Sequence, residues 1–168
     1  NYEYFQFVNS SVLHRSDIYA KLNGVNSSCS LSGLTLSKDK QHSATYINTD
    51  HAKPHCKSSQ NFKSILNDMS SGVFNGRTVV QEDSQKTNSR QSNKNLLLSD
   101  KALMNSNPQL EIYADDVKCA HGSTTGALDK EALFYMQSRG INKEESSSLL
   151  IRGFDSELIN ELKNEEKK

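Results

Sequence analysis

The chain has 168 residues, equal numbers of basic and acidic residues, and a Ser and Asn content of roughly a quarter. Its Leu, Ile, Val and Phe content of roughly 22% lies just above the range typical of disorder, and its length suits one domain or two small ones. A net charge of zero disfavours nucleic acid or an anionic membrane as the main partner. No apolar run is long enough to span a bilayer.

Two further features concern the setting of the protein. The three cysteines, Cys29, Cys56 and Cys119, are odd in number and widely spaced, which disfavours a disulfide scaffold and indicates free thiols in a reducing cytosol. The chain begins Asn-Tyr-Glu-Tyr-Phe, with no initiator Met and no signal-peptide pattern. We therefore expect an N-terminal part of the protein to be missing.

Short strand-like runs recur before residue 128, several with alternating apolar and polar residues. Clusters rich in Ser, Asn, Asp and Gly separate them, and we interpret Asn23-Gly24, Asn75-Gly76 and Ser84 to Asn95 as turns. The stretch Lys86 to Lys94 is interpreted as a solvated turn or a stacked polar ladder. The expected strands are Tyr2 to Val8, Ile18 to Leu22, Cys29 to Leu36, Ala44 to Asn48, Val73 to Val80, Asn95 to Ser99 and Leu110 to Ala114.

The strand pattern leaves two architectures open, a β-sandwich or barrel and a parallel β-solenoid. The absence of long helical patterns between the strands disfavours a doubly wound α/β fold. The spacing of the strands is irregular, at about 11 to 16 residues, and it shows no clean repeat.

After residue 128 the sequence predicts two helices. Asp129 is the expected N-cap of the first helix, and Gly140 is expected to end it in the left-handed conformation. Asn142 is the expected cap of the second helix, in which Leu150, Phe154, Leu158 and Leu162 repeat every four residues. These helices cannot form a core alone, so their apolar side must pack on the β body, on each other or on a partner.

Cys119 and His121 form the densest candidate site. In an extended segment, side chains two positions apart project from the same face, so the pair could address one metal ion or one sulfur species. A nearby imidazolium or Lys118 would lower the pKa of the thiol. The alternative is that Cys119 is a small buried residue and His121 a turn residue.

A second cluster contains His51, His55 and Cys56. Pro54 lies between the two histidines and disfavours a helical zinc site, so a structural role in a turn is the preferred interpretation. A zinc-binding interaction module using these residues remains an alternative. No nucleophile elbow or phosphate-binding loop is present in the sequence.

Several stretches form a distinctive set: LSGLTL, DHAKPHC, GVFNGRTVV, QKTNSRQSNKNLLLSD, PQLEIYADDVKCAHGSTTGALDKEALFYMQSRGI and LLIRGF. Together they resemble the SufB/SufD family of iron–sulfur cluster assembly proteins, and within it the C-terminal part of SufD. Gly122 stands where SufB-like members have Glu, which favours the SufD side of the family over a SufB-like paralogue.

The resemblance implies a right-handed parallel β-helix over residues 1–128, without its N-terminal part, and a helical C-terminal domain over residues 129–168. It implies a non-catalytic scaffold subunit of the SufBCD complex, with ATP hydrolysis expected in SufC. The β-helix would pair with SufB, or form a homodimer in isolation, and the helices would dock SufC. The expected contacts with SufC are Phe134, Tyr135, Leu150 and Phe154.

The resemblance also places Cys119 and His121 at the SufB interface, where the nascent cluster forms. Iron or an iron–sulfur cluster would then be held transiently there, with no stably bound cofactor. The expected location is the cytoplasm, or the plastid stroma in a plastid-bearing eukaryote. A polysaccharide-active β-solenoid enzyme is the alternative from another class, but the adjacent carboxylates Asp115 and Asp116 would point to opposite faces of a strand.

Overall fold

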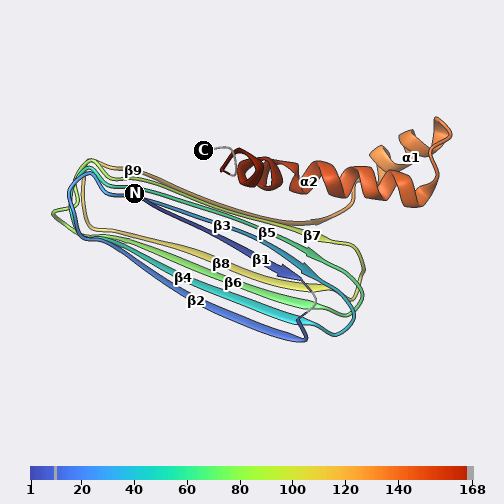
Figure 1. Cartoon of the computed structure of the whole chain (residues 1–168), viewed down its shortest axis with the longest axis horizontal. Coiled ribbons are helices and arrows are strands. Elements are labelled where there is room, and N and C mark those ends of the chain that lie inside the picture. The colour runs from blue at the N-terminus through green and yellow to red at the C-terminus, as the bar shows by residue number, and fades with distance from the viewer. Residues whose placement is uncertain (10, 166–168) are drawn as a thin grey trace.

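Two parallel sheets followed by two helices make up residues 1–9 and 11–165, the part of the chain that the computed structural model describes (Figure 1). Strands β1, β3, β5, β7 and β9 form one sheet in that order, here sheet A, and β2, β4, β6 and β8 form sheet B. The strands are β1 (Tyr2–Asn9), β2 (Leu13–Leu22), β3 (Ser28–Ser37), β4 (His42–His51), β5 (Lys57–Leu66), β6 (Ser71–Val80), β7 (Asn88–Leu97), β8 (Leu103–Ile112) and β9 (Lys118–Ala127).

Successive strands alternate between the two sheets, so each pair of strands completes one coil of a solenoid. Paired residues lie 27 to 31 positions apart in sheet A and 29 to 32 positions apart in sheet B. Every pairing is parallel, which is the arrangement of a β-solenoid and excludes an antiparallel sandwich or barrel. The parallel β-helix that the resemblance implied is confirmed.

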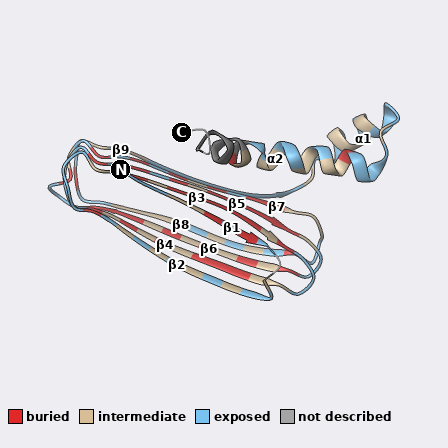
Figure 2. Cartoon of the chain, viewed as in Figure 1, coloured by how far each residue is buried: buried red, intermediate tan, exposed pale blue. Residues whose placement is uncertain are grey.

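The core is narrow and lies between the two sheets, where buried residues follow the inner faces of the strands (Figure 2). Its apolar part is centred on Phe62 and Phe74, whose ring centroids are 5.6 Å apart. Polar residues also face inward, and Gln60, Gln91 and Asn93 are at most 1% exposed. A solenoid core of this kind accommodates the Ser- and Asn-rich composition because stacked polar side chains bond to one another.

One column of turns is hydrogen-bonded from coil to coil. Asn26, His55 and Lys86 occupy equivalent positions between sheet B and sheet A, and all three have left-handed backbone with φ of 61° to 62°. Their amides donate to a carbonyl of the next coil, namely Asn26 to Pro54 (3.3 Å), His55 to Gln85 (2.9 Å) and Lys86 to Asp116 (2.7 Å). These bonds offset the strain of left-handed non-glycine residues.

Two interpretations of the sequence are wrong. Asn75-Gly76 lies inside β6, and most of the stretch Ser84 to Asn95 belongs to β7 rather than to a turn. In both places polar residues are paired with equivalent positions of the neighbouring coils, so turn-forming residue types continue a strand. The polar-ladder interpretation of Lys86 to Lys94 holds for the part of it in β7. Strand β5 was not among the expected strands.

The helices are α1 (Lys130–Ser138) and α2 (Lys143–Glu165). Asp129 caps α1 by accepting from the amides of residues 131 and 132, and Gly140 follows α1 with φ of 87°. Asn142 caps α2 by accepting from the Glu145 amide at 2.8 Å. The predicted caps are therefore confirmed, while Leu162 lies outside the residues whose side chains are described.

Helix α2 lies over the outer face of sheet A (Figure 1). Leu34 and Lys63 point outward from β3 and β5, yet both are buried. Lys63 Nζ donates to the carbonyl of Phe154 at 2.8 Å and lies 5.5 Å from the centroid of the Phe154 ring. The apolar stripe of α2 therefore packs on the β body, and Leu158 in this stripe is fully buried.

No helix among residues 1–9 and 11–165 is both long and apolar enough to cross a membrane. All three cysteines carry free thiols: Cys29 and Cys56 are buried and Cys119 is half-buried. The expectation of unpaired thiols is therefore confirmed.

Candidate functional site

The candidate site lies on β9, the last strand of sheet A. Cys119 and His121 are two positions apart on this strand and face the same side as the inward residues of β7, because they pair in register with Ser89 and Gln91. No described strand of sheet A covers β9 on its other edge. Cys119 is therefore half-buried and His121 exposed. The prediction that both side chains share one face is confirmed.

Cys119 ends an inward column of small polar and sulfur-bearing residues. Below it lie Ser89, Ser58 and Cys29, each one coil further from β9. The Ser89 and Ser58 hydroxyls are 2.8 Å apart, and Ser58 Oγ lies 2.8 Å from Nε2 of the fully buried His51. A continuous hydrogen-bonded chain therefore runs from a buried imidazole to the residue beneath Cys119.

The thiol of Cys119 is not activated in this structure. Burial raises its pKa above the usual 9.0, and a hydrogen bond with the backbone of Ser89 only partly opposes this. Lys118 cannot lower the pKa as predicted, because adjacent residues of a strand point to opposite faces. The expected activation of the thiol is wrong for the chain alone.

His121 ends a second column, which is built from amides. Gln91 donates to Oε1 of Gln60 at 2.7 Å, and Gln60 donates to the hydroxyls of Thr49 and Thr78 at 3.0 Å each. Oε1 of Gln91 is buried and has no hydrogen-bond partner among the described residues. This unpaired acceptor lies one coil below His121, whose ring supplies the next polar group in the column.

The described residues do not supply a complete set of metal ligands. No group of three or more His, Cys, Asp or Glu side chains that could hold a metal ion occurs within the described residues. Cys119 and His121 offer two ligands, whereas zinc and iron–sulfur sites in proteins use three or four. A metal or cluster bound here would need further ligands from another chain.

The zinc-module alternative finds no support in the geometry. His51 is buried in the core and bonded to Ser58, and burial lowers its pKa to about 4 despite the nearby Asp50. His55 lies in a left-handed turn, while Cys56 is fully buried in the apolar cluster. The three side chains do not form a metal-binding group.

The carboxylate pair considered for a polysaccharide-active enzyme is also unsuited to catalysis. Asp115 and Asp116 lie in the turn between β8 and β9, not on a solenoid face. Asp116 forms an ion pair with Lys86, the left-handed residue of the preceding turn. This carboxylate therefore joins two turns of the solenoid.

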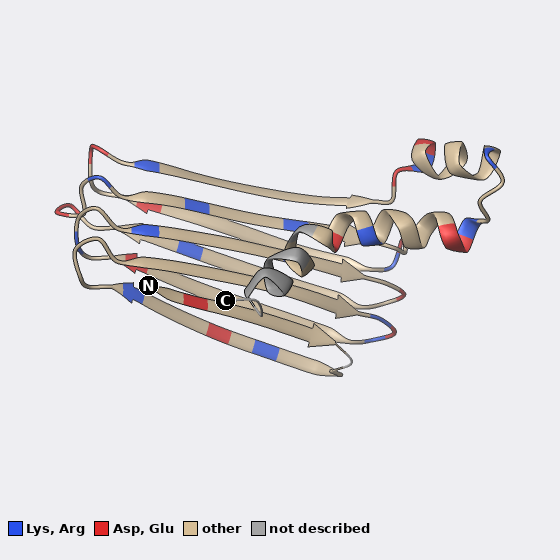
Figure 3. Cartoon of the chain, turned by 45° about the horizontal axis from the view of Figure 1, so that its top comes forward, with Lys and Arg blue, Asp and Glu red and all other residues tan. Residues whose placement is uncertain are grey.

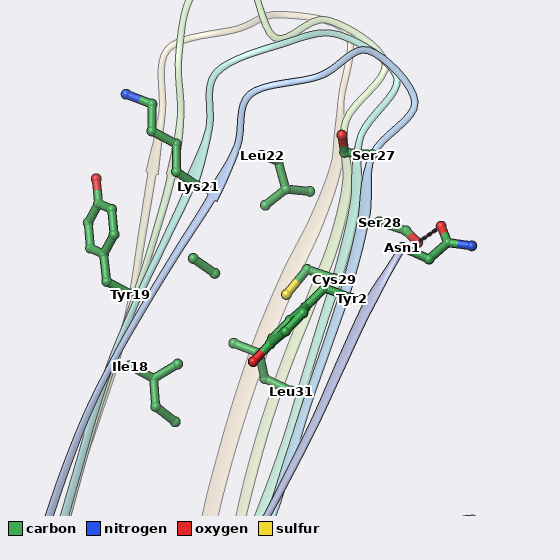
Figure 4. A pocket seen from close by; sticks show the side chains of 11 residues that line it. Asn1, Tyr2, Ile18, Tyr19, Lys21, Leu22, Ser27, Ser28, Cys29 and Leu31 are labelled. Atoms are coloured by element: carbon green, nitrogen blue, oxygen red, sulfur yellow. Dashed lines mark hydrogen bonds between the residues drawn. The ribbon is translucent and has the colours of Figure 1, made fainter. Parts of the chain in front are cut away.

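A separate cavity opens at the β1 and β2 end of the core, with a volume of about 380 Å³ (Figure 4). Tyr2, Ile18, Leu22, Cys29 and Leu31 are among the residues that line it. Its described lining contains no His, Asp or Glu, and burial raises the pKa of the Cys29 thiol. It therefore offers a recess of mixed polarity without a carboxylate or imidazole among its described lining residues.

The residues expected to contact a partner ATPase divide into two groups. Phe134 and Tyr135 on α1 are 74% and 59% exposed. Leu150 is half-buried, and Phe154 packs against Lys63 of β5. The α1 pair is therefore exposed, whereas Phe154 attaches α2 to the solenoid.

Ser89 and Gln91 support the site but were not among the predicted residues, and His51 was considered only as part of the separate cluster with His55 and Cys56. The signal that identifies Ser89 and Gln91 is their offset of 30 residues from Cys119 and His121, which is one coil of the solenoid. This offset has no meaning until the pairing of β7 with β9 is known.

Comparison with known proteins shows which proteins the chain is similar to. Residues 1–154 match the family model described as SUF system FeS cluster assembly, SufBD core domain. The iron–sulfur cluster assembly protein SufD of Escherichia coli is 38% identical over 159 residues, which are 95% of this chain and 38% of that protein. An iron–sulfur cluster assembly SufBD family protein of Synechocystis is 38% identical over 77% of this chain and 28% of that protein. A chloroplastic protein of Arabidopsis thaliana is 44% identical over 56% of this chain and 20% of that protein. The chain thus spans well under half the length of these relatives.

Proposed function

The chain belongs to the SufBD core family of SUF-system iron–sulfur cluster assembly proteins, and from this premise we propose that it is a scaffold subunit of a SufBCD complex. In this proposal the protein carries no catalytic activity, and SufC supplies ATP hydrolysis. It would act in the cytoplasm, or in the plastid stroma of a plastid-bearing eukaryote.

One observation carries this proposal: Cys119 and His121 lie together on the inward face of β9, at the uncovered edge of sheet A. A thiolate and an imidazole are ligands suited to iron or to a cluster. Because the described residues offer only two ligands here, SufB would pair with β9 and supply the others. Iron, sulfide or a nascent cluster would be cargo at this interface and not a resident cofactor.

A raised pKa for Cys119 is compatible with this role. A protonated thiol on the isolated subunit is protected from oxidation, since the thiolate is the reactive form. Iron arriving at the interface would displace the proton, because metal binding requires the deprotonated ligand. The pair would therefore become active only in the assembled complex.

The helices are the proposed docking surface for SufC. Phe134 and Tyr135 are large apolar side chains exposed on α1, and such side chains are enriched at interfaces. Leu150 and Phe154 would support this surface by holding α2 on sheet A. Full-length protein carrying Phe134→Ser and Tyr135→Ser should lose co-purification with SufC while retaining SufB. Undiminished SufC binding would contradict the docking proposal.

The site is tested by His121→Ala and Cys119→Ser in cells that depend on this protein for iron–sulfur maturation. His121→Ala should abolish maturation of a reporter enzyme while the complex with SufB and SufC still purifies, and Cys119→Ser should reduce maturation less. Ala120→Ser is the matched control, because it adds a hydroxyl between the two residues on the opposite face of β9. Normal maturation by His121→Ala would refute the assignment.

A further inference from the structure

The outer face of sheet A is divided into two halves. Near the ends of the strands it is covered by α2, which buries Leu34 and Lys63. Near the starts of β3, β5 and β7 it is open and forms a groove with a volume of about 500 Å³. This basic groove is lined by Ser28, Ser30, Lys57, Ser59, Asn88 and Arg90, among others.

The chemistry of the groove is cationic and rich in hydrogen-bond donors. Lys57 and Arg90 are exposed, and neither forms an ion pair within the described residues. Lys57 of β5 pairs with Asn88 of β7, which in turn pairs with Lys118 of β9. Lys118 is also exposed, so it extends the positive charge to β9. Figure 3 shows basic residues near the starts of neighbouring strands.

No carboxylate side chain is among the groove's lining residues. Glu3 is the acidic residue of β1 on this face, and the strands of Ser30 and Ser59 separate it from Arg90. Because the whole chain has no net charge, the positive charge of the groove is a local feature. Local charge of one sign in a groove attracts ligands of the other sign.

The spacing of the charges indicates the shape of the ligand. Lys57 and Lys118 are two strands apart, which is about 10 Å in a sheet with about 4.8 Å between strands. A ligand with several carboxylates therefore meets more of this row of cations than a single phosphate or carboxylate does. Carboxylates along an extended peptide lie about 7 Å apart at every second residue, so a short acidic segment can reach several cations of the row.

The lining residues also disfavour nucleic acid as the ligand. None of them is aromatic, whereas single-stranded nucleic acid is bound by stacking of bases on aromatic side chains. The hydroxyls of Ser30 and Ser59, 3.0 Å apart, and the amide of Asn88 instead offer neutral donors between the charges. We propose that the basic groove binds an extended acidic segment of a partner protein, rich in Asp and Glu.

A fluorescein-labelled peptide of ten glutamates tests this proposal by fluorescence anisotropy with the full chain. Binding should be measurable at low salt and weaken as salt increases, because exposed ion pairs are screened. Lys57→Glu with Arg90→Glu should weaken binding at least tenfold. The matched control is Lys38→Glu with Lys101→Glu, which makes the same charge change on exposed turn residues and should alter binding less than twofold.

Neutral substitutions, Lys57→Gln with Arg90→Gln, guard against an effect of charge reversal on folding and should give an intermediate loss. Equal losses for the groove and control variants would overturn the proposal, as would absence of peptide binding at low salt. Two competitors complete the test: inorganic phosphate at matched ionic strength and a ten-nucleotide DNA strand. Stronger competition by either competitor than by unlabelled peptide would also overturn it.

Discussion

Gly76 is the position where the polar core is most sensitive to one added methyl group. It faces inward from β6, and a Cβ there would lie 2.1 Å from Nε2 of Gln91 and 2.9 Å from the Phe74 ring. Both neighbours are almost fully buried, so neither can move into solvent. Gly76→Ala would displace Gln91 from its 2.7 Å hydrogen bond to Gln60.

The expected cost of Gly76→Ala has two parts. Overpacking of a dense core costs about 1–3 kcal/mol, and leaving a buried amide without its partner costs about 1–3 kcal/mol. The alanine also restricts the unfolded chain, which returns about 0.4–1 kcal/mol. We therefore expect the free energy of unfolding to fall by about 2–4 kcal/mol.

The measurement is urea denaturation followed by far-UV circular dichroism. Gly122→Ala is the matched control, because nothing lies within 4 Å of its added methyl group, and it should be nearly neutral. Gly76→Ala combined with Gln91→Ala should cost less than the sum of the two single variants, since one clash is removed. If Gly76→Ala unfolds at the same urea concentration as Gly122→Ala, the packing argument is refuted.

Three further predictions concern titration, helix docking and thiol reactivity. Burial lowers the pKa of His51 from 6.5 to about 4, so between these pH values the unfolded chain binds more protons than the folded chain. The free energy of unfolding should therefore fall by about 3 kcal/mol as the pH decreases from 6.5 to about 4. His51→Gln should flatten this pH dependence, and an unchanged slope would contradict it. Lys63→Met should speed hydrogen exchange in α2 by removing the bond to Phe154, whereas unchanged exchange would show that this bond does not hold the helix. In the folded protein Cys119 should react first with iodoacetamide, because the other two cysteines are buried. The rate of this reaction should still increase as the pH rises above 9, and a plateau below pH 9 would disagree with the raised pKa of Cys119.

The helical part of the fold could be predicted well because its signals are local. Asp129, Gly140 and Asn142 act within a few residues of their own positions, and all three have the predicted roles. The placement of α2 could not be predicted in the same way. It involves Lys63, a buried lysine on the outer face of β5 that contacts Phe154 of α2.

The solenoid was harder to predict from residue patterns because its stabilising contacts lie about 30 residues apart. Gln91, Asn93 and Asn95 suit a turn when only their neighbours in sequence are considered. In the structure they point from β7 into the solenoid core. Gln91 and Asn93 bond to the preceding coil, and Asn95 bonds to the following coil. The site follows the same logic: a shared face for Cys119 and His121 follows from strand geometry, whereas the supporting Ser89 and Gln91 require the pairing of β7 with β9.

The constant strand length has a consequence for how this protein tolerates insertions. Strands β2 to β9 each have ten residues, while paired positions lie 27 to 32 residues apart, so the connections absorb the differences in coil length. A residue inserted in a connection leaves the columns formed by the strands in place. A residue inserted in β9 before Cys119 would turn both Cys119 and His121 to the opposite face. Length changes among related chains should therefore be confined to the connections.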